Sequence, residues 1–457
     1  MTDDPHFDPA GRTVCIETYG CQMNVYDSAA IGGLLVARGW RPVEDPALAD
    51  VVLLNTCSVR DHAEHRVISR IGELRHLRPE HGGRPRLIGV CGCMAERLAG
   101  QLVQGRPGAD LAVGVDQYDR LPDLLDGLLA GEAVPARTAV GHRDDAHYVA
   151  PPAAYPENNS HLVTIHKGCD YRCTYCIVPD TRGPQREKAP AAILDEIVAI
   201  VAAGGVEVTL LGQNVTAWRG EGGLDFADLL GQVAAVPGLR RIRFLTGHPR
   251  DLTDRLLRTI AGLPTVCPWL HVPAQSGSDR VLRRMKRLYT RADYLRMVAN
   301  ARAWIPGVTF SSDFIVGFPG ETDNDFRETL ELVEAVGYDQ LFAFKYSPRP
   351  GTPADRLADD VTEAVKKERL AALLATQAAA WLPLARAQVG QVWRIAVEGP
   401  ARRPPGWSRA RTANNRKVVL EAGEPVPGTE LTVRIIGFTD TTFRGEPIAG
   451  PPSDETR

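Results

Sequence analysis

Cys169-Asp170-Tyr171-Arg172-Cys173-Thr174-Tyr175-Cys176 places three cysteines within eight consecutive residues, shortly after the apolar run 162–165. That run has the composition of a buried parallel strand, so the cysteines should lie in a loop beyond its carboxyl end. Three thiolates hold three irons of a four-iron cubane and leave the fourth iron open to a substrate, whereas a closed electron-transfer cluster uses four. We therefore predict a catalytic [4Fe-4S] cluster on Cys169, Cys173 and Cys176.

The same loop admits a second interpretation, a structural zinc site. Zinc loops of this kind usually combine one CxxC pair with a second CxxC or with a pair of histidines. His166 is the only nearby residue that could complete such a set. The strand before the loop favours the iron–sulfur interpretation.

Six apolar runs, separated by helical patterns such as 191–203 and 323–336, predict the strands of the middle of the chain. They are 162–165, 206–211, 241–245, 269–272, 308–315 and 340–345. This alternation predicts a partial (β/α)6 barrel, in which the chemistry lies at the carboxyl ends of the strands.

The N-terminal part, up to about residue 129, also alternates between apolar runs and helical patterns. The runs are 14–18, 51–54 and 87–90, and the second and third are almost continuously apolar, as strands buried on both faces are. We predict a small doubly wound α/β domain here, so that the chain as a whole is an α/β protein.

Three further cysteines, Cys21, Cys57 and Cys93, each follow one of these runs at intervals of 36 residues. The carboxyl ends of parallel strands share one edge of a sheet, so the three thiols can converge on a second cluster. The alternative is three buried apolar cysteines, but each lies in a polar, turn-like context. Cys91, two residues before Cys93, complicates the assignment, while Cys15 and Cys267 have the surroundings of core residues.

After a long helical pattern at 363–388, the chain changes to short strand patterns at 392–398, 417–421 and 431–438, which predicts a small β-barrel. Between the first two lies a stretch without acidic residues that contains Trp407 and suits RNA phosphate contacts with stacking, although a solvated loop is the alternative. Its cationic residues are Arg402, Arg403, Arg409, Arg411, Arg416 and Lys417. A second cationic group lies on an amphipathic helical pattern, which either approaches RNA near the active site or forms a solvated face. It comprises Arg280, Arg283, Arg284, Lys286, Arg287 and Arg291.

Composition bounds the remaining properties. The 457 residues divide into an N-terminal domain at 12–130, a Pro-rich linker at 131–154, a core at 155–385 and a small barrel at 387–450. The formal net charge is only -3, so nucleic-acid binding must use local patches. No signal peptide and no apolar run near the ~20 residues of a membrane span is present, so we expect a cytoplasmic protein. No sequence feature demands an oligomer, so we expect a monomer.

Seven motifs together make the chain similar to the radical S-adenosylmethionine methylthiotransferases, over about residues 12–447. They surround Cys21 (Y-G-C-Q-M-N), Cys57 (N-T-C-S-V-R), Cys93 (G-C-M-A-E-R) and the CxxxCxxC loop, and include L-L-G-Q-N-V, H-V-P-A-Q-S-G-S and S-D-F-I-V-G-F-P-G-E-T. The resemblance is greatest to the branch that modifies N6-isopentenyladenosine at tRNA position 37. It implies a radical-SAM barrel and a C-terminal TRAM domain that binds tRNA.

The resemblance also implies cofactors and their contacts. Two [4Fe-4S] clusters are implied, one on the loop and one on Cys21, Cys57 and Cys93, with Cys91 as a spectator. The loop cluster binds S-adenosylmethionine and cleaves it to a 5′-deoxyadenosyl radical, while the other carries sulfur for insertion at the ring C–H, and two S-adenosylmethionine molecules are used. The expected cofactor contacts are Tyr175, Gly212, Gln213, Asn214, Asp313, Ile315 and Gly317, although L-G-Q-N at 211–214 stands where the family usually has Gly-Gly-Glu.

The resemblance further implies an electron donor of flavodoxin or ferredoxin type and a tRNA with isopentenyladenosine beside its anticodon. Two other functions remain open at this point. The same chemistry acts in related enzymes on threonylcarbamoyladenosine or on an aspartate of a ribosomal protein. From a different class, an RNA-binding protein with structural zinc would carry the same cysteines without catalysis. His248 and His271, at expected strand ends, are interpreted as pocket residues.

Overall fold

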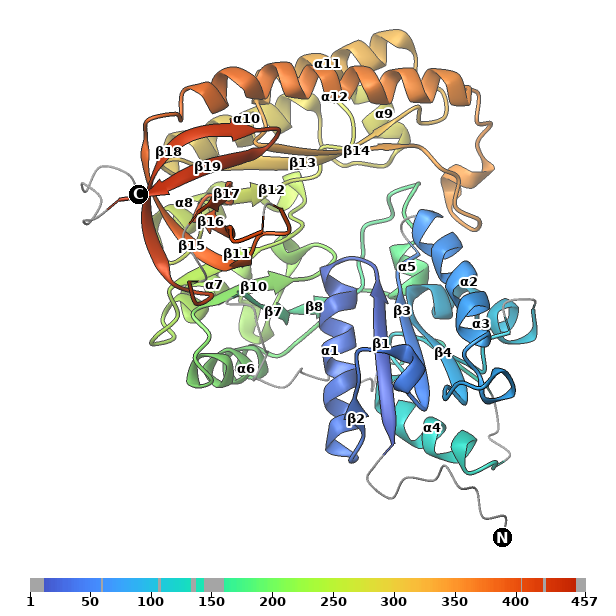
Figure 1. Cartoon of the computed structure of the whole chain (residues 1–457). Coiled ribbons are helices and arrows are strands. Elements are labelled where there is room, and N and C mark those ends of the chain that lie inside the picture. Colours follow the sequence, from blue (N-terminus) through green and yellow to red (C-terminus); the bar gives the residue numbers. More distant parts are fainter. Residues whose placement is uncertain are drawn as a thin grey trace. The chain divides into compact units, whose positions relative to one another are not determined.

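The computed structural model describes residues 12–58, 61–105, 108–132, 137–143, 160–403, 405–421 and 425–448. They form two compact units, coloured along the chain in Figure 1. The first unit contains the described residues up to 143, together with Lys167–Tyr171 and Ile177–Arg186. The second unit contains residues 160–166, Arg172–Cys176 and the described residues from 187 onward. Of the three loop cysteines, Cys169 therefore belongs to the first unit, and Cys173 and Cys176 belong to the second.

The first unit is built on a six-stranded parallel sheet with the order β2-β1-β3-β4-β5-β6. Its strands are β1 (Thr13–Tyr19), β2 (Arg41–Pro42), β3 (Val51–Thr56), β4 (Leu87–Gly92), β5 (Leu111–Val113) and β6 (Thr138–Ala139). Its helices are α1 (Gln22–Ala37), α2 (Asp61–Arg75), α3 (Cys93–Gln104), α4 (Leu121–Leu129) and the short α5 (Val178–Thr181).

Both faces of this sheet are covered, which explains why its strands are apolar along most of their length. On one face Leu53 packs with residues of α1 and α4, in a core that includes Ile31 and Leu125. On the other face Leu54 packs with residues of α2 and α3, including Ile71. The predicted doubly wound domain is confirmed.

Part of the interval predicted as a linker, 131–154, belongs to this sheet. Thr138 and Ala139 form the edge strand β6 and pair in parallel with Ala112 and Val113 of β5. Two residues give too little hydrophobic periodicity to indicate a strand, so the sequence pattern did not reveal it. Residues 133–136 and 144–154 of that interval lie outside the described residues.

The second unit begins with six parallel strands in two groups, β11-β10-β7 and β12-β13-β14. Backbone hydrogen bonds between Ile242 and the segment before β12 join the groups, with Cys267 N 2.9 Å from Ile242 O. The strands are β7 (Ser160–Thr164), β10 (Glu207–Leu211), β11 (Arg241–Phe244), β12 (Trp269–His271), β13 (Thr309–Val316) and β14 (Gln340–Lys345). The predicted partial (β/α)6 barrel is confirmed.

Helices follow these strands and cover their outer side. They are α6 (Pro190–Ala202), α7 (Phe226–Ala234), α8 (Asp254–Gly262), α9 (Asp279–Arg284), α10 (Arg291–Trp304), α11 (Asp323–Val336) and α12 (Glu363–Arg386). Along β13, Phe310 and Phe314 belong to the core shared with these helices, whereas Asp313 and Ile315 alternate to the inner side. The chain passes between the units at β8 (His166–Lys167) and β9 (Arg186–Glu187).

The second unit ends in a closed five-stranded barrel with the order β15-β16-β17-β19-β18. Its strands are β15 (Val392–Pro400), β16 (Ser408–Thr412), β17 (Lys417–Leu420), β18 (Glu430–Thr439) and β19 (Thr442–Pro447). The expected small β-barrel is confirmed, with β16 and β19 in addition to the predicted strands. Its β16–β17 turn docks at the amino ends of the larger barrel, where Arg243 Nη1 and Nη2 donate to Ala413 O and Thr412 O at 2.8 and 2.9 Å.

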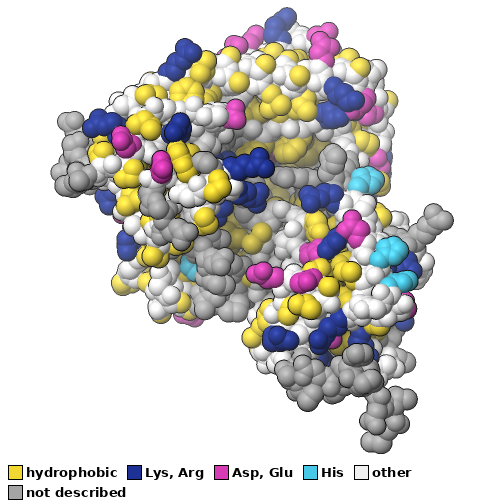
Figure 2. All heavy atoms as spheres, in the orientation of Figure 1, with side chains coloured by type: hydrophobic (Ala, Val, Ile, Leu, Met, Phe, Trp, Pro, Cys, Tyr) yellow, Lys and Arg dark blue, Asp and Glu magenta, His cyan; other side chains and the backbone are white. Residues whose placement is uncertain are grey.

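The surface carries charges of both signs. On the face drawn in Figure 2, Lys and Arg side chains are interspersed with Asp and Glu and with hydrophobic side chains, as expected from a net charge of -3. Among the helices of the described ranges, none is both long enough and apolar enough to cross a membrane.

Candidate functional site

The sheet of the first unit brings the three N-terminal cysteines to one edge. Tyr19, Thr56 and Gly92 are the last residues of adjacent strands and lie directly opposite one another in the ladder. Cys57 and Cys93 immediately follow Thr56 and Gly92, and Cys21 follows Tyr19 by two residues. The three cysteines, spaced by 36 residues in sequence, therefore lie within two residues of the carboxyl ends of adjacent strands.

The thiols of Cys21 and Cys57 are hydrogen-bonded to each other. The hydrogen bond from Cys57 lowers the pKa of Cys21 to about 6, against the opposing effect of burial, and the charge of Arg182 lowers it further. Cys21 also caps the amino end of α1, where backbone N–H groups favour a thiolate. Cys21 is thus poised to be an anionic ligand near neutral pH.

Cys93 is buried at the first position of α3 and has a cationic partner. Burial raises the pKa of its thiol, and Arg182 acts in the opposite direction. The Nε of Arg182 donates to Cys93 Sγ at 3.3 Å. The Nη1 of Arg182 is also buried and has no partner among the residues that the structure describes. Three thiols with a fixed cation and a spare donor fit an anionic iron–sulfur cluster.

Two asparagines brace this edge, and sequence reasoning did not single them out as side chains. Asn24 Nδ2 donates to Asn55 Oδ1 and to Thr56 O, each at 3.1 Å. Asn55 Nδ2 returns a bond to Asn24 O at 2.9 Å. Gly92, at φ 92°, fits beneath them, since a Cβ there would lie 2.5 Å from Asn55 Oδ1. Both asparagines belong to motifs that were noted for their cysteines: Asn24 ends Q-M-N, and Asn55 begins N-T-C.

Three cysteines were not predicted to bind a cluster, and all three are buried: Cys15, Cys91 and Cys267. Cys91 lies on β4 with no exposed surface, and burial raises its pKa to about 12. Burial likewise raises the pKa of Cys15 to about 11 and that of Cys267. These surroundings favour neutral thiols.

The CxxxCxxC loop is attached to each unit by backbone bonds. In the first unit, Cys169 N donates to Gly183 O at 3.1 Å. In the second, Thr174 N donates to Met285 O at 3.1 Å. Within the loop, Cys176 N donates to Cys173 O, also at 3.1 Å. Cys169 and Cys176 are partly exposed and Cys173 is buried.

Arg287 corrects one interpretation of the cationic group at 280–291. Instead of lying on a solvated face, it is buried, and its Nη1 donates to Cys173 Sγ at 3.6 Å. Other members also serve the fold: Arg280 pairs with Asp325, and Arg284 Nε donates to Pro319 O at 3.0 Å. Helix α9 ends at Arg284, and Lys286 beyond it has φ 54°.

Some of the expected S-adenosylmethionine contacts lie together beside the loop. Tyr175 and Ile315 both pack on a small apolar cluster that includes Met285 and Phe318. Gly317, just after β13, has φ 69°, and its N–H bonds Glu321 Oε1 at 3.0 Å. The second unit thus offers a half-buried aromatic ring and an apolar wall next to Cys173 and Cys176.

The contacts expected after β10 are arranged around His166. Asn214 N donates to His166 Nε2 at 3.1 Å, and burial lowers the pKa of this imidazole to about 3, so it is neutral. A Cβ on Gly212 would lie 2.4 Å from the ring, so glycine is required. The side chain of Asn214 is bound to Asp251 at 2.6 Å, whereas Gln213 Oε1 is buried without a partner in the described ranges. Gln213 is the residue of this group with a buried acceptor still available.

The two histidines interpreted as pocket residues are hydrogen-bonded within the second unit. His248 Nδ1 accepts from Arg250 N at 3.2 Å, and burial lowers its pKa to about 2. His271 Nδ1 lies 2.9 Å from Ser311 Oγ, and its Nε2 lies 3.6 Å from Asp313 Oδ2. Asp313, an expected cofactor contact, is thereby placed on the inner side of the barrel.

Within the described ranges, no three His, Cys, Asp or Glu side chains are arranged to hold a single metal ion. A single zinc ion needs its ligands around one point, whereas a cubane binds each thiolate at a different iron. His166, the residue that would complete a zinc set, already uses its Nε2 as an acceptor.

The six expected RNA contacts divide into two groups. Arg402, Arg403, Arg409 and Lys417 are exposed. Arg411 instead pairs with Glu398 at 2.7 Å, and Arg416 is held by Asp339 at 2.7 Å while lying over the Trp393 ring. Arg416 therefore anchors the small barrel, and the expectation that it contacts RNA finds no support in its position.

Comparisons with known proteins agree with this geometry. A model of the radical SAM superfamily matches residues 163–333, and a model described as the uncharacterized protein family UPF0004 matches residues 13–114. The fold is similar to that of the radical S-adenosylmethionine methyltransferase TsrM from Kitasatospora setae, with a TM-score of 0.57 and 14% identity over 86% of this chain and 80% of that one. Fold and loop together define a radical SAM enzyme.

Full-length relatives define the family. The chain is 44% identical over 452 residues to a tRNA-2-methylthio-N(6)-dimethylallyladenosine synthase of Acidithiobacillus ferrooxidans, covering 97% of this chain and 99% of the relative. It is 43% identical over 403 residues to the synthase of the same name from Agrobacterium fabrum, covering 86% and 88%. The chain belongs to the family of tRNA-2-methylthio-N(6)-dimethylallyladenosine synthases.

Proposed function

We propose that this protein converts N6-(dimethylallyl)adenosine at tRNA position 37 to its 2-methylthio derivative, consuming two S-adenosylmethionine molecules. The observation that carries the proposal is the convergence of Cys21, Cys57 and Cys93 at one sheet edge, in a chain that also has the CxxxCxxC loop. Two iron–sulfur sites in one chain match a reaction that needs both a radical source and a sulfur carrier.

The reaction replaces a ring C–H by C–SCH3, and an sp2 C–H has no acidic proton for a general base to remove. When bound, the cluster on Cys169, Cys173 and Cys176 supplies the electron that cleaves S-adenosylmethionine, and the cluster on Cys21, Cys57 and Cys93 supplies a site for the sulfur. Burial lowers the pKa of His166 and of His248, so both imidazoles are weak bases, which agrees with a reaction that needs no proton abstraction from the ring.

The residues of the second unit have separate tasks in this proposal. Tyr175 and Ile315 form an apolar wall against which the adenine of S-adenosylmethionine packs. Gln213 offers its buried Oε1 to a polar group of the cofactor. Arg287 holds the Cys173 sulfur and keeps a permanent positive charge beside it.

The small barrel supplies a surface for tRNA. Arg409 on β16 lies opposite Val419 of β17, which in turn lies opposite Arg444 of β19. Lys417 lies opposite Arg411 on the same strands. The cation of Arg444 lies 5.0 Å above the ring of Trp407. Exposed cations on three neighbouring strands, with an aromatic ring beside them, suit phosphate contacts and base stacking.

The remaining partners are proposed on chemical grounds. Cleavage of S-adenosylmethionine at an iron–sulfur cluster requires a one-electron donor of low potential, for which a flavodoxin or ferredoxin is the appropriate class. We propose that the protein acts as a monomer, since each iron–sulfur site draws its ligands from one chain.

Nucleoside mass spectrometry on tRNA tests the function. Cells that lack the protein are compared with the same cells carrying the wild-type chain or a Cys57→Ala variant. We expect 2-methylthio-N6-dimethylallyladenosine only with the wild-type chain, and its unthiolated precursor in the other two. An unchanged nucleoside profile on deletion contradicts the proposal, and a change in threonylcarbamoyladenosine derivatives instead reassigns the substrate.

A further inference from the structure

Arg182 and Asp27 form a buried ion pair in the first unit. Arg182 Nη2 lies 2.8 Å from Asp27 Oδ2, and each side chain is only 3% exposed. Asp27 lies on α1, about one turn after Asn24, and Arg182 caps the carboxyl end of α5. Removing two charges from water is costly even when they are paired, so stability alone does not explain this pair.

The other two nitrogen atoms of the Arg182 side chain lie outside this ion pair: one contacts a cysteine, and one has no partner in the part of the chain that the structure describes. Its Nε donates to Cys93 Sγ at 3.3 Å, and its Nη1 is buried with no partner among the described residues. The guanidinium therefore contacts one of the three proposed ligands directly, and it has one donor left for a further acceptor.

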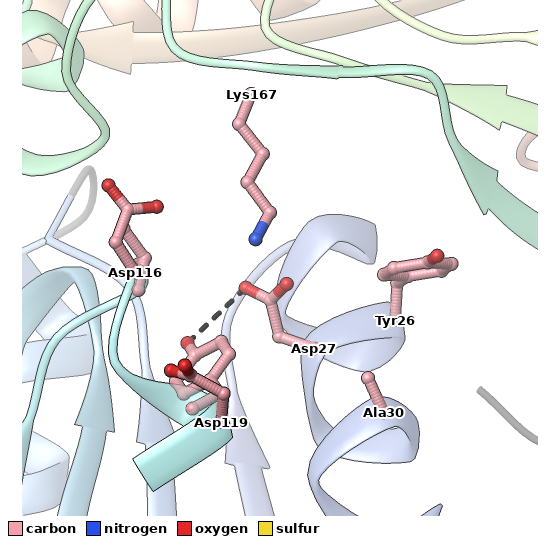
Figure 3. Close-up of a pocket in the computed structure, with 8 residues that line it drawn as sticks. Tyr26, Asp27, Ala30, Asp116, Asp119 and Lys167 are labelled. Carbon is pink, nitrogen blue, oxygen red and sulfur yellow. Dashed lines mark hydrogen bonds between the residues drawn. The ribbon is translucent and has the colours of Figure 1, made fainter. Parts of the chain in front are cut away.

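The carboxylate of Asp27 has neighbours other than Arg182. Tyr118 Oη lies 3.5 Å from Asp27 Oδ2, and the ammonium of Lys167 points between Asp27 and Asp116 (Figure 3). Asp116 is in turn paired with Arg186, whose Nη1 lies 2.8 Å from its Oδ2. Arg182, Lys167 and Arg186 thus face the carboxylates of Asp27 and Asp116, while Asp119, which lines the same pocket, is paired with Arg143.

We propose that Arg182 is a positioning residue that holds the Cys93 sulfur and raises the reduction potential of the N-terminal cluster. The inference rests on the proposed function, because it requires a [4Fe-4S] cluster on Cys21, Cys57 and Cys93. Reduction of that cluster adds one electron and breaks no bond, so the reduced form carries one more negative charge. A buried cation beside the ligands stabilises that form relative to the oxidised one.

The test isolates the N-terminal cluster in the full chain. The triple substitution Cys169→Ala, Cys173→Ala and Cys176→Ala removes the loop cluster, and the remaining cluster is titrated with dithionite while its EPR signal is followed. In this background Arg182→Gln keeps hydrogen-bond donors but loses the charge. We expect its midpoint potential to become more negative by at least a tenfold change in the reduction equilibrium, about 59 mV for one electron.

Two more variants separate charge from structure. Asp27→Asn removes a negative charge from the same network and should shift the midpoint potential in the positive direction. Arg182→Lys restores the charge and should recover most of the wild-type value. A damaged fold would not give shifts of opposite sign. Arg70→Gln, which breaks a partly exposed ion pair with Glu17 elsewhere in the first unit, should leave the potential unchanged.

Each outcome has one meaning. An unchanged potential in Arg182→Gln with the cluster bound overturns the inference. If Arg182→Gln binds no iron, the Asp27→Asn shift decides: a positive shift supports the inference, and no shift or a negative one overturns it. If the triple variant with Arg182 intact binds no cluster at all, the second cluster of the proposed function fails instead.

Discussion

The guanidinium of Arg287 lies 3.6 Å from the sulfur of Cys173, buried beneath the CxxxCxxC loop. In the first unit, Arg182 stands in the same relation to Cys93 at 3.3 Å. Arginine stays protonated in proteins, so each of these cysteines has a permanent cation as its neighbour. One ligand of each proposed cluster is thus held by a buried arginine that comes from outside its own motif.

Replacing Arg287 by methionine should destabilise the second unit. Arg287 Nη2 donates to Pro273 O at 2.9 Å and its Nε to Tyr289 Oη at 3.3 Å, so the change leaves buried acceptors without donors. We expect a loss of about 2–4 kcal/mol in the free energy of unfolding, measured in urea. Arg283→Met is the matched control, because Arg283 is exposed on the same segment and should change stability by less than about 0.5 kcal/mol. Equal losses in the two variants would contradict the role of Arg287.

Substituting one cysteine from each set should separate two activities. Cys173→Ala is expected to abolish reductive cleavage of S-adenosylmethionine and therefore all methylthiolated product. Cys57→Ala is expected to retain cleavage, because the loop is intact, but to lose sulfur insertion. Chromatography of 5′-deoxyadenosine and of tRNA nucleosides from the same reactions measures both. Methylthiolation by Cys57→Ala would remove the N-terminal cluster from the reaction.

Gly92→Ala should disturb the edge that carries the three N-terminal cysteines. A Cβ at φ 92° would lie 2.5 Å from Asn55 Oδ1 and 2.6 Å from Thr56 O. We expect a loss of about 2–4 kcal/mol in stability and a lower iron content in a chain that lacks the loop cysteines. Gly100→Ala on α3 meets no atom within 4 Å and should instead stabilise by about 0.5–1 kcal/mol. Iron content equal to wild type in Gly92→Ala would count against the proposed ligand geometry.

The contribution of His142 to stability should depend on pH. A hydrogen bond to Asp116 raises the pKa of His142 above its ordinary value, and its Nε2 also bonds Asp180 O at 3.1 Å. Because the pKa is higher in the folded state than in the unfolded one, protonation stabilises the fold. This stabilisation is complete below the unfolded pKa of about 6.5 and disappears as the pH rises through the folded pKa. Urea unfolding of wild type and His142→Gln should therefore differ more at pH 5.5 than at pH 8.5, and a constant difference would refute the assignment.

The exposed cations of the small barrel should govern affinity for tRNA. Lys417→Glu and Arg409→Glu each remove one proposed phosphate contact and should weaken binding of unmodified tRNA severalfold at moderate salt. In each variant the slope of log K against log salt should fall by about 1, because one phosphate fewer is neutralised. Arg327→Glu, an exposed change on α11, controls for net charge. If it weakens binding equally, the effect is general charge repulsion and not a specific surface.

Local patterns in the sequence were sufficient to predict the fold class, and they singled out six cysteines as candidate cluster ligands. Apolar runs such as 51–54 identified strands, because burial on both faces of a parallel sheet requires apolar residues at consecutive positions. The 36-residue interval identified the second set of cysteines, because equal repeats place residues at the same end of neighbouring strands. The two-residue strand β6 was missed, since it is too short to produce a periodic pattern.

The sequence by itself determined which residues can hold iron and which segments surround them. Only the tertiary structure decided which cations serve the cysteines: Arg287 belongs to a segment with an exposed, amphipathic pattern, and Arg182 follows the loop without any motif that links it to Cys93. The reason is physical. Strand ends and loop ligands are specified by local hydrophobic periodicity and spacing, whereas the partner of a buried charge is specified by packing between residues as far apart as 155 positions, as for Arg182 and Asp27.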